Sequence, residues 1–133
     1  METNRVLILS AIFIILLIVL VLLTGGVRED VYIRNYTLSP NNHTLTITVD
    51  NSSKLRHIGK AKIKQDGNDL YLKFYTAYGF NANLGTKDTY ELDVTNIDEI
   101  YFYIGKKGYK KVLELRNKVW NEPYNEITVN KKI

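Results

Sequence analysis

The chain has 133 residues, a formal net charge of +4 and no cysteine. This length leaves room for one globular domain, and the lack of cysteine excludes disulfides, Cys-ligated zinc, thiol catalysis and a lipidated cysteine. The charge is only mildly basic, short of what a dedicated nucleic-acid-binding domain carries.

The N-terminal part of the chain is a long apolar segment. Between residues 6 and 23 only Ser10 is polar. As a helix this run is roughly 27 Å long at about 1.5 Å per residue, close to the thickness of the bilayer hydrocarbon core. A helix of a soluble core would show polar residues at a period of 3.6, and this run does not. We predict a short flank at residues 1–5 and a transmembrane anchor in the lipid bilayer at residues 6–27.

A cleaved signal peptide is the alternative, because the small residues at positions 24–26 could admit a peptidase after Gly26. Signal-peptide apolar regions usually run about 7 to 15 residues, so the greater length favours an uncleaved anchor. Arg5 precedes the apolar run while Arg28 and Arg34 follow it, so the charge count does not decide the orientation. A very short, positively charged N-terminal flank usually stays inside. We therefore expect a single-pass protein of the cell membrane with an extracytoplasmic C-terminal domain.

Most of the remaining chain alternates apolar and polar residues at a period of two, between runs of turn-forming residues. In residues 44–49, three apolar side chains share one face and three threonines the other. The Asp66-Gly67 pair predicts a hairpin, because glycine takes the positive φ that tight turns require. The predicted strands are residues 31–38, 44–49, 58–65, 70–76, 90–94, 100–104 and 109–115.

The segments between and after these strands are polar. Residues 78–88 predict a long loop, residues 105–108 a hairpin turn, and residues 116–133 a loose extension with a short strand at 127–129. No stretch after the anchor sustains a helical period. We predict an all-β fold, a small antiparallel β-sandwich or partly open barrel of about seven strands, at residues 28–120, with a C-terminal extension at 121–133.

Several aromatic and glycine positions resemble a known group of proteins. They are residues 70–75 (LYLKFY), 83–85 (NLG), 100–103 (IYFY) and 108–109 (GY). Over roughly residues 36–120 the chain resembles a largely uncharacterised family of small membrane-anchored or lipoprotein-type envelope proteins of Firmicutes, especially clostridia-like bacteria. The resemblance implies an envelope location and this architecture, without catalytic residues. Lipoprotein members carry a cysteine after the signal, which this chain lacks, so its anchor must be the helix.

Tyrosines on two predicted strands form the main candidate site. Tyr71, Tyr75, Tyr101 and Tyr103 alternate with the apolar residues of strands 70–76 and 100–104, and Lys73 lies among them. If the two strands share a sheet, these side chains share a face, which suits recognition of an envelope protein or a cell-wall polymer. A cross-strand aromatic ladder that stabilises the sheet, partly covered by a loop or the tail, explains the same pattern.

A lysine stripe follows one of the predicted strands. Lys60, Lys62 and Lys64 alternate along residues 58–65. They could meet anionic lipid or wall polymer, but we favour a charged edge strand that resists aggregation.

Acidic residues gather near strand 90–94, and two of them could form the catalytic carboxylate pair of a hydrolase. However, carboxylates need a cleft to acquire catalytic pKa values, and alternating strand charges usually face solvent. The two histidines, His43 and His57, lie in or beside predicted loops without a second histidine at ligand spacing, so we predict no metal and no cofactor. The acidic cluster comprises Asp88, Glu91, Asp93, Asp98 and Glu99.

These observations favour a non-catalytic, membrane-tethered interaction module outside the cytoplasm, with no nucleic-acid partner. Two alternatives remain from other classes. One is a carboxylate-dependent envelope hydrolase, and the other is a basic small-barrel nucleic-acid binder, which requires a cytoplasmic domain.

Overall fold

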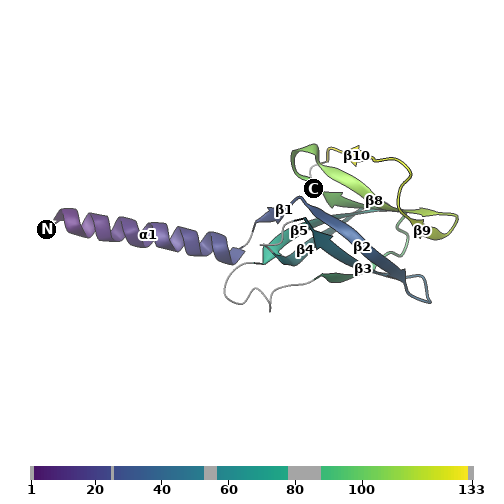
Figure 1. The fold of residues 1–133 in the computed structure, drawn as a ribbon, viewed down its shortest axis with the longest axis horizontal. Coiled ribbons are helices and arrows are strands. Elements are labelled where there is room, and N and C mark those ends of the chain that lie inside the picture. The colour runs from purple at the N-terminus through teal and green to yellow at the C-terminus, as the bar shows by residue number, and fades with distance from the viewer. Residues whose placement is uncertain (1, 25, 53–56, 78–87, 132–133) are drawn as a thin grey trace.

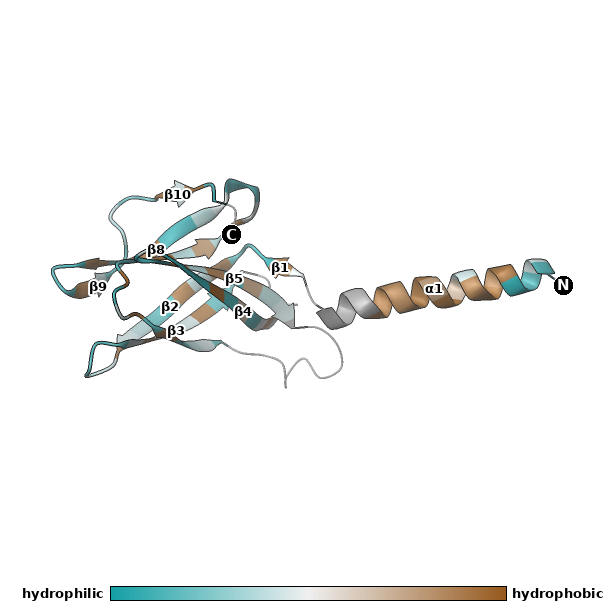
Figure 2. Cartoon of the chain, turned by 180° about the vertical axis from the view of Figure 1, so that it is seen from behind, coloured by the Kyte–Doolittle hydropathy of each residue, from teal (hydrophilic) through white to brown (hydrophobic). Residues whose placement is uncertain are grey.

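The computed structural model describes residues 2–24, 26–52, 57–77 and 88–131. An apolar helix, α1 (Glu2–Thr24), leads into a β-domain (Figures 1 and 2). In the described part of the chain, α1 is the one helix that is long and apolar enough to cross a membrane. The rest of the chain does not bury its residues from Glu2 to Val19. The predicted loop at 78–88 lies outside the described residues, apart from Asp88.

The β-domain consists of two facing sheets, and the predicted all-β fold with one N-terminal apolar helix is confirmed. The smaller sheet has the order β2-β3-β6, with bounds β2 (Val31–Leu38), β3 (Thr44–Asn51) and β6 (Thr89–Asp93). The larger sheet contains β1 (Val27–Arg28), β4 (His57–Asp66), β5 (Asp69–Ala77), β7 (Glu99–Tyr103), β8 (Tyr109–Arg116), β9 (Val119–Asn121) and β10 (Thr128–Val129). The seven predicted strands correspond to β2 through β8.

One strand pair departs from the predicted antiparallel arrangement. β5 and β7 run parallel, with Tyr71 opposite Tyr101. Between them the chain leaves the larger sheet and adds β6 to the smaller one. Because the chain returns to the first sheet only after this excursion, β7 enters in the same direction as β5, as crossover connections require.

The core lies between the two sheets, and the alternating apolar residues supply it. Leu45 and Ile47 of β3 have no exposed surface, and Phe74 of β5 is equally buried. The Phe74 ring packs edge-on against Phe102 of β7, with 4.8 Å between the ring centres. Burial of each such side chain contributes about 1.5–3 kcal/mol.

A tyrosine hydroxyl connects the two sheets at each of their two edges, and one of these edges holds a cavity. On one side the Tyr90 hydroxyl of β6 donates to the Gly59 carbonyl of β4 at 3.2 Å, and burial raises the pKa of Tyr90 to about 12. On the other side the Tyr36 hydroxyl of β2 donates to the Trp120 carbonyl of β9 at 3.4 Å. The second side holds a cavity between β2 and β8, so the domain is a partly open barrel.

The prediction of a loose tail from residue 116 is wrong for the described part of that segment. β9 pairs with the end of β8, and Trp120 on β9 is 5% exposed within the core. β10 pairs with the start of β8, which confirms the short strand predicted near residues 127–129.

The turn between β8 and β9 stores backbone strain. Asn117 and Lys118 both have positive φ, 53° and 65°, although neither is glycine. Because Lys118 is exposed and a side chain there disfavours this conformation, we expect Lys118→Gly to raise the free energy of unfolding by about 1 kcal/mol and Tm by roughly 5 °C. Thermal unfolding followed by circular dichroism measures the change. Lys118→Ala is the control, and an equal gain from alanine would contradict the strain explanation.

A buried arginine stabilises the junction between α1 and the domain. Arg28 on β1 is 5% exposed and donates to the Asp30 carboxylate at 2.9 and 3.0 Å. Ser52 also donates to Asp30, at 3.0 Å. Burial alone would raise the pKa of Asp30, but the hydrogen bonds from Arg28 and Ser52 hold it below its ordinary value. Arg28 therefore fixes β1 to the domain instead of presenting a free flanking charge.

Candidate functional site

The predicted tyrosines do share one face, the outer face of the larger sheet, but two of them are not accessible. Tyr71 and Tyr101 are 4% and 5% exposed. Their rings stack with 4.9 Å between centres and 12° between planes. The expectation that these two side chains are exposed is wrong, and the contact between them is the cross-strand ladder of the alternative interpretation.

The C-terminal segment covers these two rings. Tyr109 of β8 packs edge-on against Tyr71 at 5.0 Å, and Val129 of β10 lies over the cluster. Gly108 permits this approach, because a Cβ at that position would lie 2.2 Å from the Val129 carbonyl oxygen. Lys131 then places its ammonium group 4.9 Å from the centre of the Tyr71 ring.

A hollow of about 450 Å³ remains open beside the covered rings. The half-buried Lys73 lies in it, with its ammonium group 4.5 Å from the centre of the Tyr103 ring. Tyr75 lies next along the same face of β5 and is also half-buried. We call this hollow the lysine–tyrosine pocket; it is lined by Lys73, Tyr103, Gly105, Gly108, Tyr109, Asn130 and Lys131.

The pocket has a positive electrostatic character. Lys131 forms an ion pair with Asp66, whereas no carboxylate of the described residues forms an ion pair with Lys73. Lys106 and Lys107 are exposed on the adjoining short helix η1 (Gly105–Lys107). The acid at the rim is Glu29, whose carboxyl group would lie 2.6 Å from a Cβ placed on Gly105. An anion entering the pocket would therefore meet Lys73, whose ammonium group has no ion-pair partner among the described residues.

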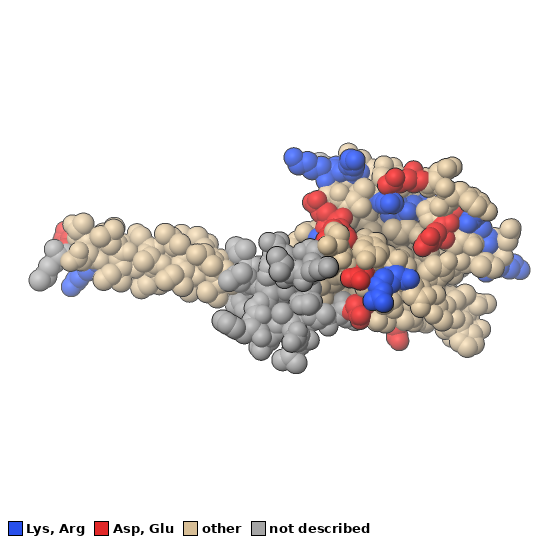
Figure 3. Space-filling model, viewed as in Figure 1, with Lys and Arg blue, Asp and Glu red and all other residues tan. Residues whose placement is uncertain are grey.

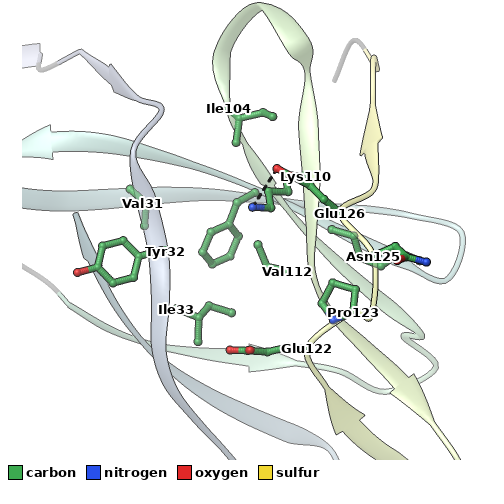
Figure 4. Close-up of a pocket in the computed structure, with 12 residues that line it drawn as sticks. Val31, Tyr32, Ile33, Ile104, Lys110, Val112, Glu122, Pro123, Asn125 and Glu126 are labelled. Atoms are coloured by element: carbon green, nitrogen blue, oxygen red, sulfur yellow. Dashed lines mark ion pairs between the residues drawn. The ribbon is translucent and has the colours of Figure 1, made fainter. Parts of the chain in front are cut away.

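A second cavity, of about 320 Å³, lies between β2 and β8 and is shown in Figure 4. Its walls are mainly apolar, with Val31 and Ile33 from β2 facing Val112 from β8. At its rim Lys110 and Glu126 form an ion pair at 3.2 Å. Because this rim cation already has a partner, the cavity offers mostly apolar contact, and we call it the seam pocket.

A buried charge network lies beside the stacked tyrosines. Lys111 of β8 is 6% exposed, and its ammonium group lies 2.9 Å from the Glu99 carboxylate and 3.5 Å from that of Glu114. The Tyr101 hydroxyl donates to Glu99 at 2.5 Å. Each polar group of this network has a partner, so it serves structure.

The pKa values in this network follow from burial and from the partners. Burial alone would raise the pKa of Glu99, but the hydrogen bonds from Tyr101 and Lys111 hold it below its ordinary value. Burial alone would lower the pKa of Lys111, and the contacts with Glu99 and Glu114 raise it instead. Burial raises the pKa of Asp69, and the neighbouring Glu99 and Asp98 raise it further.

The predicted acidic cluster is divided between the two sheets. Glu91 and Asp93 are exposed on β6 of the smaller sheet, whereas Asp98 and Glu99 lie at the start of β7 in the larger one. None of these, nor Asp88, lines the lysine–tyrosine pocket or the seam pocket. Among the described residues, no group of three or more His, Asp or Glu side chains could hold a metal ion.

The sequence interpretation missed five residues of the pocket, two of which are Gly105 and Gly108, predicted only as part of a hairpin turn. Tyr109 opens the strand that follows Tyr103, so its place on the same face could have been read from the alternation. Asn130 and Lys131 carried no such signal, because they reach the pocket only through the pairing of β10 with β8.

Comparison of this chain with protein-family models, with curated proteins and with solved structures finds no match, so the resemblance to small envelope proteins of Firmicutes stays a prediction.

Proposed function

We propose that this chain is a membrane-tethered, extracytoplasmic and non-catalytic interaction module, which holds an anionic group of an envelope partner in the lysine–tyrosine pocket. The observation that carries the proposal is the half-buried Lys73 ammonium group, which rests on the Tyr103 ring without a carboxylate partner among the described residues. A partly desolvated cation gains from an anionic partner, and the aromatic ring orients the ammonium group for it.

The membrane part of the proposal rests on α1. Its length and apolar composition suit a membrane span, and its side chains between Glu2 and Val19 are left uncovered by the domain. Digestion of intact cells with an external protease tests the orientation. A domain cleaved from outside would exclude the cytoplasmic nucleic-acid binder, while full protection would contradict the extracytoplasmic placement.

The position of the acidic residues gives no support to the hydrolase alternative. Glu91 and Asp93 are exposed on one sheet while Asp98 and Glu99 belong to the other. None of these carboxylates lines the lysine–tyrosine pocket or the seam pocket, and a catalytic acid–base pair requires a shared cleft.

Substitution of Lys73 tests the pocket directly. We expect Lys73→Gln to weaken binding of soluble linear polyphosphate by about tenfold, because a half-buried ion pair contributes on the order of 1.4 kcal/mol more than a neutral contact. Titration calorimetry of the full chain in a non-ionic detergent measures the dissociation constant. Binding by the natural chain should also weaken as salt is added.

The matched control for this titration is Lys64→Gln. Lys64 is exposed on β4, pairs with Tyr71 across the strands and does not line the pocket. The Lys64→Gln substitution removes the same charge as Lys73→Gln. If the pocket is specific, the dissociation constant should change by less than about twofold. Equal weakening by both variants would mean general attraction to a basic surface and would contradict the proposed site.

A further inference from the structure

α1 enters the β-domain at β1 (Figure 1). β1 begins three residues after α1 ends, and it pairs with Phe74 and Tyr75, directly beside Lys73. Glu29, which follows β1, contacts Gly105 of η1. The pocket and the neighbouring Lys106 and Lys107 of η1 are therefore close to the point where the chain would leave a bilayer.

This end of the domain has a charge asymmetry. On the larger sheet, Lys62 is exposed and pairs with Lys73 across the strands, and Lys106 and Lys107 are exposed on η1. Glu29 is the acid beside η1. Basic side chains gather along the upper edge of the domain in Figure 3, on the side towards α1.

Among the described residues, the smaller sheet presents two acidic side chains at the same end. Asp50 of β3 is 46% exposed, and Asp88 is exposed where the chain enters β6. In this part of the described chain, Arg34 lies near Asp50, with its guanidinium group 4.0 Å from the Asp50 carboxylate. An anionic surface next to this end would attract Lys73, Lys106 and Lys107 and would repel Asp50 and Asp88.

We propose that the outer face of the larger sheet lies down on the bilayer that holds α1, with Lys73, Lys106 and Lys107 in contact with anionic lipid headgroups. This inference rests on the proposed function and names the lipid headgroup as the occupant of its pocket. The half-buried Tyr103 and Tyr75 would lie at headgroup level, where tyrosine is enriched in membrane proteins. Because α1 already holds the domain at the surface, a few lysine contacts suffice to orient it.

The orientation can be measured with single-cysteine labels, since the natural chain has no cysteine. Lys64→Cys places a fluorophore on the outer face of the larger sheet, and Glu91→Cys places one on the outer face of the smaller sheet. The full-length chain is reconstituted in nanodiscs of phosphatidylcholine alone or with about 30% phosphatidylglycerol. Both kinds of disc carry a headgroup-bound quencher.

In anionic discs we expect quenching at position 64 to be several-fold stronger than at position 91, and nearly equal at both positions in neutral discs. Each lysine near an anionic surface multiplies the surface-bound population by about fivefold. Lys106→Gln with Lys107→Gln should therefore lower the ratio of surface-bound to upright domain by about 25-fold. Salt near 1 M should abolish the difference.

The control combines Arg116→Gln with Lys118→Gln, which removes the same charge at the far end of β8, away from the pocket, and should leave the quenching ratio unchanged. Equal quenching at both labels in anionic discs would overturn the inference, as would equal effects of the two double variants. If polyphosphate binds through Lys73 but the labels show no preference, the lipid occupant is refuted and the proposed function stands. If neither occurs, both are refuted.

Discussion

Replacing Trp120 with alanine is expected to lower the free energy of unfolding of the β-domain by about 4 kcal/mol. The indole belongs to the main core cluster and is 5% exposed, although it comes from a strand of three residues near the end of the chain. Truncation would remove the apolar contact area of the indole and leave a cavity in the core between the two sheets. Chemical unfolding of the full chain in detergent measures the loss. Far-UV circular dichroism must follow it, because the substitution removes the sole tryptophan.

Tyr124→Ala is the control for this experiment. Tyr124 is 87% exposed, and its contact is the Arg116 guanidinium group at 3.8 Å from the ring centre. Such an exposed cation–π pair contributes at most about 1 kcal/mol. If Trp120→Ala lowered the free energy of unfolding no more than Tyr124→Ala, β9 would not contribute to the core.

The strands that the sequence predicted are those whose signal is local. In β3, three apolar residues alternate with threonines, and all three are buried. The Asp66-Gly67 hairpin is present, with Gly67 at a φ of 61° and Asp66 paired with Asp69. Period-two alternation and turn residues can be read without tertiary information.

The elements that were missed lack a local signal. β1 has two residues and β9 has three, so neither is long enough to show alternation. The turn before β9 consists of Asn117 and Lys118, and without a glycine it does not read as a tight hairpin. Both strands form because the edges of longer strands offer unpaired backbone groups, which is a tertiary property.

The candidate site was also predicted only in part, because some of its contacts have a local sequence signal and others do not. Alternation correctly placed Tyr71 and Tyr101 on the face opposite the apolar residues. It could not show that β10 lies over that face, since a two-residue strand pairs with β8 only once the sheet exists. Burial of the two rings and the addition of Lys131 to the pocket both follow from that one long-range contact.

Removal of the Lys111 ammonium group is the second substitution with a large expected effect. Lys111→Met keeps most of the side-chain volume but leaves Glu99 and Glu114 without their shared cation. Because the ion pair is buried, we expect a loss of about 3 kcal/mol in the free energy of unfolding at pH 7. Lys110→Met on the same strand is the matched control. Its ion pair with Glu126 is exposed, so the loss should stay below about 1 kcal/mol.

The pH dependence of the Lys111→Met defect distinguishes an electrostatic cause from a packing defect. In the natural chain the pKa of Glu99 is held below its unfolded value, so its stabilisation is present above that value and is lost as pH falls through the lower, folded pKa. In the variant, Glu99 loses the ammonium group that lowers its pKa while burial still raises it, so less of this stabilisation remains to be lost as pH falls. Urea unfolding at pH 7 and near pH 4 should therefore show the two proteins converging in stability. A difference that stays constant with pH would assign the effect of Lys111 to packing.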